Sequence, residues 1–211
     1  MMSANSTSQG LLKDYVVAFG TLFNNIRIKR EYSSKSDQYS EPGPIIAVPL
    51  TYAPKARFAQ RINQDLGLNR PTQITLPRMS FEMTSVTYAP ERKLNTMNRT
   101  VKKLESPYSY TTTTGNGYVT GTWAPVPYDF AFSLNIYIKN IEDGTNIIEQ
   151  ILPYFTPEFT VTLKSATDLG IKLDLPVVLS AVNLEDSFEG GFDDRRIITW
   201  TLDFIMKGMI Y

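Results

Sequence analysis

The sequence predicts an α+β domain in which two or three helices pack on a mixed, mainly antiparallel β-sheet, with a protruding β-hairpin. Residues 128–140 and 198–206 alternate apolar and polar side chains, as half-buried strands do. Residues 11–26 and 58–66 instead have the apolar spacing of helices. Because helices and strands do not alternate regularly along the chain, an antiparallel or mixed sheet is favoured over the parallel sheet of a βαβ fold.

The first predicted helix follows a short polar segment, residues 1–10, which we expect to be a mobile arm. Its apolar residues form one wide stripe that is typical of a helix packed on a core. The residues of this stripe are Leu11, Leu12, Tyr15, Val16, Phe19, Leu22, Phe23 and Ile26. From Ile26 the pattern changes to a period of two, which predicts a strand with Ile28 buried and Arg27 and Lys29 exposed.

Two of the next strands contain proline. Residues 45–54 predict a strand that Pro49 restricts to a sheet edge or a bulge. Residues 74–90 predict a long alternating strand that Pro77 interrupts. Between them, residues 55–67 return to helical spacing and end at a glycine that suits a helix C-terminus.

Residues 91–127 are predicted to form an insertion that protrudes from the domain as a hairpin. A Gly115-Asn116-Gly117 turn is flanked by alternating threonine, tyrosine and β-branched residues. Because both faces of this hairpin are polar or aromatic and carry little aliphatic surface, it cannot cover a core. Two interpretations stay open: an exposed hairpin with no partner, or an arm whose strand edges contact another chain.

The stretch EQILPYFTPEF, residues 149–159, is apolar and contains two prolines. Thr145 or Asn146 is expected to cap a short helix, which must end near Pro153 because proline cannot continue it. We therefore expect a rigid turn and hypothesise that Tyr154 and Phe155 form a stiff surface near a subunit boundary. The strands predicted after this turn are residues 158–165, 173–186 and 197–208.

The residue composition excludes most kinds of catalytic site. The 211 residues include no cysteine and no histidine, so thiolate or imidazole metal sites, disulfides and histidine-based triads are excluded. Carboxylate pairs, lysine Schiff bases and Ser–Lys dyads stay possible. The sequence therefore predicts a protein that is not an enzyme and needs no metal or other cofactor.

Charge and hydropathy bear on the partners. Lys plus Arg and Asp plus Glu are both 21, and the pI is near 6.3, whereas proteins that grip nucleic acid usually present a basic face. The best candidate for single-strand binding is a basic, tyrosine-rich segment, which is also explained as a solvated face. Its basic residues are Arg92, Lys93, Arg99, Lys102 and Lys103. With no signal peptide or membrane-spanning run in the sequence, a cytosolic product without a membrane partner is expected.

Asp193 and Asp194 adjoin Arg195 and Arg196 in a glycine-containing loop. Adjacent loop residues point in different directions and unlike neighbouring charges largely neutralise each other, so a carboxylate active site is disfavoured. The alternative is a turn whose charges hold a neighbouring segment or another subunit.

Five blocks of the sequence resemble, in order and spacing, the tail sheath stabiliser and completion proteins of T4-like contractile-tailed phages. These blocks are LFNNIRIKR (22–30), VPLTYAPKARF (48–58), ITLPRMSFEM with its trailing YAP (74–90), IIEQILPYFTPEF (147–159) and RRIITWTLDF (195–204). Together they span most of residues 11–211 apart from the 91–127 insertion, which is longer and richer in threonine than the family pattern. The resemblance implies one terminator domain over residues 11–211.

The resemblance also implies a function. Members of this family form a hexameric ring at the head-proximal end of the tail, stop growth of the tube and sheath, and hold the last sheath ring extended. The implied partners are further copies of the chain, the tail sheath protein, the tail tube or its terminator, and the neck or connector proteins. DNA would pass through the ring without specific binding. The protein would be made in the host cytoplasm and reside in the virion, at the tail/neck junction.

Exposed charge and exposed strand edges select the residues expected at protein interfaces. They are Arg27, Lys29, Arg30, Gly115, Asn116, Gly117, Tyr154, Phe155, Asp193, Asp194, Arg195 and Arg196. Two other functions stay open. One is a related structural role as a neck connector or tube terminator, and the other is a single-strand nucleic-acid-binding module.

Overall fold

The computed structural model describes residues 10–30, 45–57, 75–103, 119–164, 172–186 and 197–211. Its main feature is a six-stranded sheet in the order β3-β4-β7-β10-β9-β8. In chain order the strands are β3 (Leu50–Tyr52), β4 (Arg78–Tyr88), β7 (Val126–Ile138), β8 (Glu158–Lys164), β9 (Lys172–Asp186) and β10 (Ile198–Ile210). Only the β3/β4 pair is parallel. The predicted α+β class with a mixed, mainly antiparallel sheet is confirmed.

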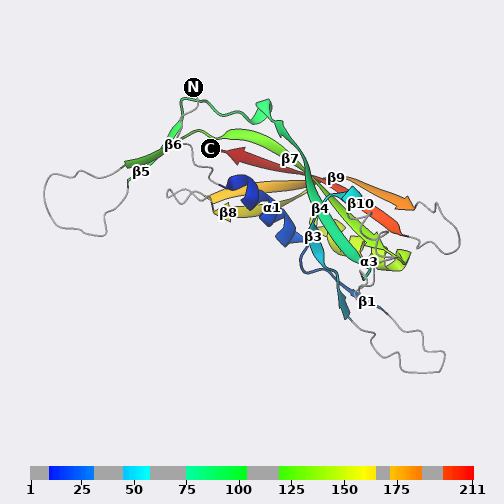
Figure 1. Cartoon of the computed structure of the whole chain (residues 1–211). Coiled ribbons are helices and arrows are strands. Elements are labelled where there is room, and N and C mark those ends of the chain that lie inside the picture. Colours follow the sequence, from blue (N-terminus) through cyan, green and yellow to red (C-terminus); the bar gives the residue numbers. More distant parts are fainter. Residues whose placement is uncertain (1–9, 31–44, 58–74, 104–118, 165–171, 187–196) are drawn as a thin grey trace, which may run out of the picture.

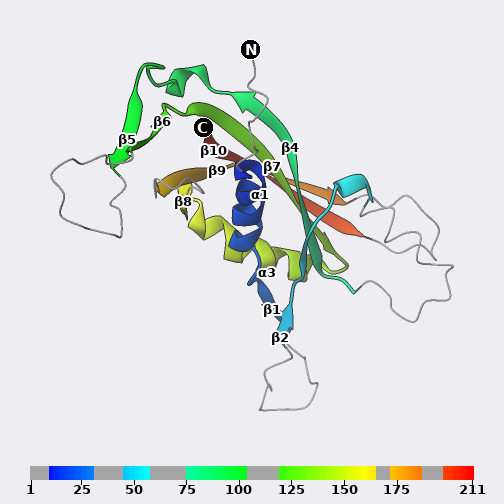
Figure 2. The same cartoon turned by 60° about the vertical axis from the view of Figure 1, so that its left-hand side comes forward.

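The sheet curls, and the helix α1 (Leu11–Leu22) lies against its hollow face (Figures 1 and 2). The ladder shifts register at Thr84 of β4, between Met83 and Ser85, and again at Asp203/Phe204 where β10 pairs with β9. Such bulges bend a strand and increase its local twist. They occur in the long central strands, where bending lets the sheet wrap around one helix.

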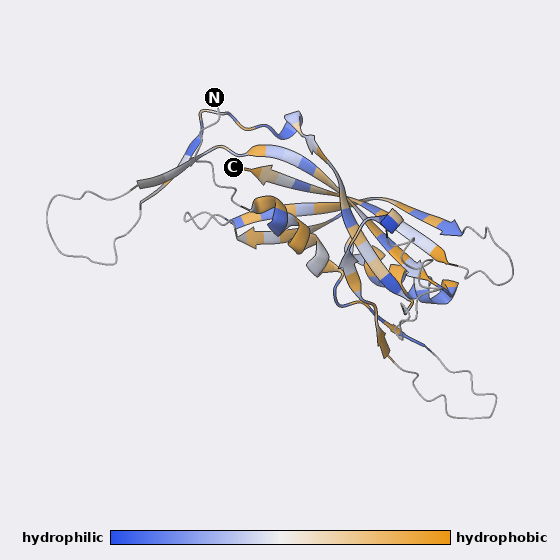
Figure 3. Cartoon of the chain, viewed as in Figure 1, coloured by the Kyte–Doolittle hydropathy of each residue, from blue (hydrophilic) through white to orange (hydrophobic). Residues whose placement is uncertain are grey.

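The core lies between α1 and the hollow face of the sheet. Phe19 is completely buried and stacks on Phe132 of β7, with ring centroids 4.4 Å apart and an interplanar angle of 9°. The rings of Phe81 and Phe204 lie 5.5 Å and 5.4 Å from the same side chain. The predicted apolar face of residues 128–140 is also confirmed, since Phe130, Phe132, Leu134, Ile136 and Ile138 are all buried. Figure 3 shows the resulting alternation of hydropathy along the strands.

Tyr15 fixes α1 to the last strand. Its hydroxyl donates a hydrogen bond to the Met209 carbonyl oxygen and accepts one from the Met209 amide at 3.2 Å. Beneath it, Gly208 leaves room for the rings of Tyr15 and Phe130, whose centroids are 5.0 Å apart. A residue near the start of the domain is thereby joined to the end of β10.

In the described part of the chain, the opposite face of the sheet carries a second buried cluster near one end of β7. There Tyr137 of β7 is 1% exposed and packs with Ala53, Leu76 and Ile197. The Ser80 hydroxyl hydrogen-bonds the Tyr137 hydroxyl at 3.3 Å. The same region holds an ion pair of 2.7 Å between Lys55 and Glu185. This second cluster was not predicted, because the alternating pattern of 128–140 indicates one buried face only.

Three predicted boundaries are corrected. The strand predicted over 45–54 is two strands, β2 (Ile45–Ala47) and β3, separated at Val48 and Pro49. The strand predicted to be interrupted by Pro77 begins after it, at Arg78, since a residue without an amide hydrogen cannot donate to the ladder. The helix predicted to be capped by Thr145 or Asn146 is α3 (Ile141–Ile151), whose N-cap is Asn140. The predicted helix over 58–66 lies outside the described residues.

Two separate ribbons extend from the main sheet. One pairs β1 (Arg27–Lys29) with β2, and the other pairs β5 (Arg99–Lys103) with β6 (Val119–Trp123). The predicted turn at 115–117 is outside the described residues, and the basic segment 99–103, expected to be part of a loop, is a strand. Figures 1 and 2 both place the β5–β6 ribbon at the end of the molecule away from α3.

Because two tyrosines are buried, we expect the folded chain to lose stability at alkaline pH. Burial raises the pKa of the Tyr15 and Tyr137 hydroxyls above the ordinary tyrosine value. Since the unfolded chain then loses these protons first, their contribution to stability is complete below pH about 10 and falls as pH rises further. We expect the free energy of unfolding, measured in denaturant between pH 8 and 11, to fall less steeply for a Tyr15→Phe, Tyr137→Phe variant.

Tyr154→Phe is the control, because the Tyr154 side chain is 66% exposed. Its pH dependence should match that of the parent chain. A double variant with the same slope as the parent would contradict the assignment of the alkaline loss to the two buried hydroxyls.

Candidate interaction surface

The stretch that the sequence singled out, residues 149–159, forms the end of α3 and the turn into β8. α3 buries Ile147, Ile148 and Ile151 against the sheet. It ends in a single 3₁₀ turn, η2 (Leu152–Tyr154), which contains Pro153. The predicted end of the helix near Pro153 is therefore confirmed, and the chain turns there toward β8.

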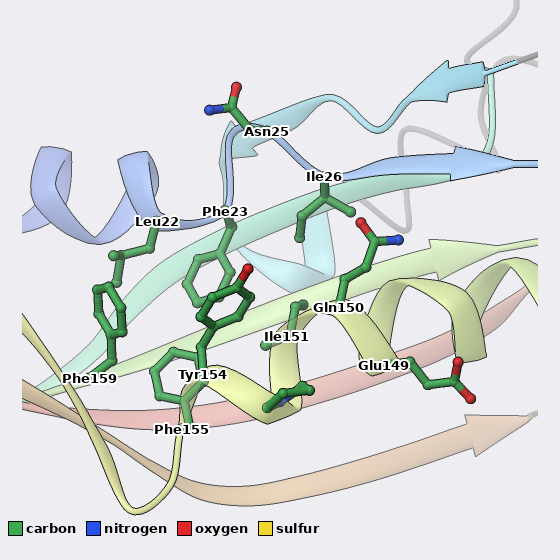
Figure 4. Close-up of a pocket in the computed structure, with 11 residues that line it drawn as sticks. Leu22, Phe23, Asn25, Ile26, Glu149, Gln150, Ile151, Tyr154, Phe155 and Phe159 are labelled. Atoms are coloured by element: carbon green, nitrogen blue, oxygen red, sulfur yellow. The ribbon is translucent and has the colours of Figure 1, made fainter.

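A pocket of about 420 Å³ opens beside this turn, between α1, β1, α3 and β8. It is called the α3 pocket below. Most of its lining is apolar and aromatic, and Glu149 is the one charged residue among the side chains that line it. These are Leu22, Phe23, Asn25, Ile26, Glu149, Gln150, Ile151, Pro153, Tyr154, Phe155 and Phe159 (Figure 4). Its volume lies in the range of about 300–1,000 Å³ that is usual for clefts that bury a ligand or a large side chain.

Tyr154 and Phe155 have different environments although they are neighbours. Phe155 packs into the core, with its ring 5.0 Å from Phe204 and 6.2 Å from Phe23. Tyr154 is 66% exposed and meets Phe159 edge to face at 6.4 Å. Phe155 thus holds the turn in place while Tyr154 presents an aromatic ring at the pocket mouth. These contacts agree with the predicted rigid turn, whose stiffness stays a prediction, as does the predicted subunit boundary.

The strand β1 is tied to α3 at both ends of the helix. The Gln150 side-chain amide donates to the Arg27 carbonyl oxygen at 2.9 Å. Arg30 binds Asp143 through two guanidinium nitrogens, at 2.7 Å and 3.3 Å. The Asp143 side chain is 6% exposed and that of Arg30 is 42% exposed. Asp143 also lies in the first turn of α3, where a negative charge is favoured by the helix dipole.

Replacement of Arg30 by alanine should destabilise the domain by about 1 kcal/mol. A buried carboxylate that loses its charged hydrogen-bond donor costs more than a surface pair, but the exposed Arg30 side chain is partly screened by water. Denaturant unfolding of Arg30→Ala, Asp143→Asn and the double variant gives their coupling energy. The exposed neighbour Lys29, replaced by alanine, is the matched control. If the destabilisation of the double variant equalled the sum of the two single destabilisations, the Arg30–Asp143 ion pair would not contribute to stability.

The described part of the chain holds no cluster of three acidic residues that could bind a metal ion. None of the helices in the described ranges is long and apolar enough to cross a membrane. The Arg92 side chain, from the basic segment considered for nucleic acid, bonds the Tyr128 carbonyl oxygen at 3.0 Å and pairs with Asp129. Arg99 lies over the Trp123 ring at 5.6 Å. Both arginines thus have contacts within the chain.

Residues 6–211 match the family model described as the T4-like virus Myoviridae tail sheath stabiliser. The chain belongs to this family. It is also similar to "Tail completion protein gp15" of Enterobacteria phage T4, with 29% identity over 204 residues that cover 93% of this chain and 69% of the relative. The family resemblance found in the five sequence blocks is confirmed, and the chain is a structural protein of the phage tail.

Only part of the predicted interface lies in the described residues. The structure brings Arg27, Lys29 and Arg30 of β1 and its end beside α3, and places Tyr154 and Phe155 at the pocket next to them. The predicted residues 115–117 and 193–196 lie outside the described ranges. Whether any of these residues contacts a partner stays a prediction.

Sequence reasoning missed most of the pocket. Phe23 and Ile26 were assigned to the core stripe of the first helix and Phe159 to a strand, yet all three line the α3 pocket. Gln150, which joins β1 to α3, gave no signal because a lone glutamine on a helix is usually solvated. Asp143 precedes the caps predicted for this helix, Thr145 or Asn146, and its partner Arg30 is 113 residues away in sequence. A link over that distance cannot be found from spacing.

Proposed function

We propose that six copies of this chain form a ring at the head-proximal end of a contractile tail. The ring stops growth of the tube and sheath, holds the last sheath ring extended, and presents a surface to the neck proteins. The family match over residues 6–211 carries this proposal. Its members are by description sheath stabilisers, and a stabiliser that ends a tail must bind the sheath, its own copies and the next component.

The shape of the molecule supports a role in assembly. Apolar side chains are exposed on both ribbons, where no core residue of the described part of the chain covers them. In the β5–β6 ribbon and the segments flanking it they are Leu94, Met97, Val101 and Trp123, and in β2 Ile45 is 67% exposed. Exposed apolar groups on projecting strands are typical of surfaces that another chain covers. Figure 3 shows that β2, in the ribbon that it forms with β1, is hydrophobic.

The charge of the chain supports passage of DNA without retention. Basic and acidic residues number 21 each, so a ring of copies has no net charge with which to collect phosphates. We propose that the tube or its terminator lies beneath the ring, in the virion, and that the protein is assembled from a pool made in the host cytoplasm.

The mass of the purified chain in solution, measured by light scattering over a concentration series with and without extended sheath, tests this function. A hexamer, alone or induced by sheath, is the expected result. Co-sedimentation with tube but not sheath would instead favour a tube terminator or neck connector. Tight binding of single-stranded DNA that weakens steeply with salt would favour the nucleic-acid-binding module.

A further inference from the structure

We propose that the α3 pocket of one subunit receives Trp123 and the adjoining face of the β5–β6 ribbon from the next subunit of the ring. The inference rests on the proposed ring function and names the contact that joins its copies. It follows from three observations. Trp123 is exposed on the ribbon, the α3 pocket is open and lined by aromatic rings, and the ribbon and the pocket carry opposite charges.

The ribbon offers a side chain suited to a pocket. Trp123 is 62% exposed, and Val101, on the same face of the ribbon, is 53% exposed. Gly121 is paired with Val101 and has no side chain, and the Arg99 side chain lies over it. Arg99 pairs directly with Trp123 across the ribbon and lies over its ring at 5.6 Å. Tryptophan and arginine are the residue types most often found at the energetic centre of an interface.

The pocket offers a matching surface. Its walls are Phe23, Ile26, Ile151 and Phe155, and the exposed ring of Tyr154 stands at its mouth, as Figure 4 shows. Its volume of about 420 Å³ is ample for an indole. The surrounding contacts are rigid, because Phe155 packs on Phe204 and Gln150 ties α3 to β1. A preformed pocket of this kind binds with a smaller ordering cost than a flexible surface.

The charges of the two surfaces are complementary. β5 carries the exposed Arg99 on the same face of the ribbon as Trp123. Among the described side chains that line the pocket, only Glu149 is charged. Because Arg99 lies over Trp123, an indole placed in the pocket would bring the guanidinium to the surface that carries Glu149. Opposite charges at the rim favour this docking direction over ribbon-to-ribbon contact.

The positions of the two surfaces suit a ring. The β5–β6 ribbon lies at the end of the molecule away from α3 in both views of the fold (Figures 1 and 2), so the ribbon does not fill the pocket of its own chain. A surface that binds a different surface on an identical copy makes a head-to-tail interface, and such interfaces close into rings when the rotation allows. The second copy is therefore the occupant that this geometry favours.

The absence of cysteine makes the contact testable by cross-linking. Val101→Cys on the ribbon and Asn25→Cys at the pocket should form disulfides only between subunits. Proteins carrying one substitution each, mixed and oxidised, should give covalent dimers, and the double variant should give a ladder up to the ring. A control pair replaces Asn25→Cys by Val86→Cys, an exposed position on β4 that does not line the pocket, and should give no ladder.

A second measurement uses Trp123→Ala and a charge exchange. Trp123→Ala should raise the dissociation constant of the subunit contact at least about 30-fold, the loss expected for a central tryptophan. Glu149→Lys and Arg99→Glu should each weaken assembly, and the two together should restore part of it. Circular dichroism and unfolding curves of each variant should match the parent, since all three side chains lie at the surface.

The outcomes separate this inference from the proposed function. A ring that forms without the ladder, and whose assembly Trp123→Ala leaves unchanged, overturns the inference and leaves the ring in place. A disulfide from Asn25→Cys to a sheath subunit carrying an engineered cysteine, in place of the ladder, would assign the pocket to the sheath and also overturn it. A chain that stays monomeric at every concentration and on sheath overturns both proposals.

Discussion

Phe19→Ala should cost about 3–5 kcal/mol in the free energy of unfolding, the range for removing a large aromatic side chain from a packed core. The ring stacks on Phe132 at 4.4 Å and contacts the rings of Phe23, Phe81 and Phe204. Alanine would leave a cavity at the point where α1, β4, β7 and β10 meet. Since a domain has about 5–15 kcal/mol of total stability, denaturant unfolding should show a large shift in the midpoint.

Val17 on the same helix supplies the control. Its side chain is 53% exposed, so Val17→Ala removes little buried surface and should change the stability by less than about 0.5 kcal/mol. Equal midpoints for Phe19→Ala and Val17→Ala would show that α1 does not form the centre of the core, and would contradict the packing described above.

Gly208→Ala should destabilise the domain by about 1–3 kcal/mol, the usual cost of forcing extra volume into a packed core. A methyl group at this position would lie 2.5 Å from Phe130 and 2.9 Å from Tyr15, both of them completely buried aromatic rings. Tyr15 cannot move away freely, because its hydroxyl bonds both backbone groups of Met209. Relief of the clash would therefore break this link or shift α1.

The matched control is Gly121→Ala, also a glycine within a strand. There the added methyl group would meet Arg99, at 2.7 Å from its Nε, and a long, flexible side chain can move aside. Gly121→Ala should be neutral or slightly stabilising, since alanine has less conformational freedom to lose on folding. If both variants lost the same stability, the tight packing around Gly208 would not explain the destabilisation caused by Gly208→Ala. Thermal or denaturant unfolding decides this.

Much of the fold could be predicted because its strands bury one face. The alternation in 128–140 and 198–206 identified β7 and β10, and the apolar stripe from Leu11 identified α1. The strand order could not be predicted, because β7 and β10 are neighbours only through pairing across some 70 residues of chain, a separation that local patterns do not encode. The burial of Tyr137 and Asn135 on the other face also depends on which segments cover that end of the sheet.

The candidate surface was predicted in part. The turn at 149–159 followed from its prolines, and Tyr154 is exposed, but its place at an interface stays a prediction. Arg30 was predicted at an interface because its charge was expected to be exposed. In the structure it pairs instead with Asp143 of α3, which is distant in sequence. The pocket itself arises where α1, β1, α3 and β8 converge, and a cavity between four elements has no local sequence signal.

We propose that this chain caps the head-proximal end of a contractile tail and keeps the sheath extended. The most direct measurement is electron microscopy of tails assembled without the protein and then incubated with the purified, gold-labelled chain. We expect label at the end of the tail away from the baseplate, and sheaths that remain extended and full-length over time. Sheaths that shorten or dissociate as they do without the chain, or label elsewhere on the tail, would contradict it.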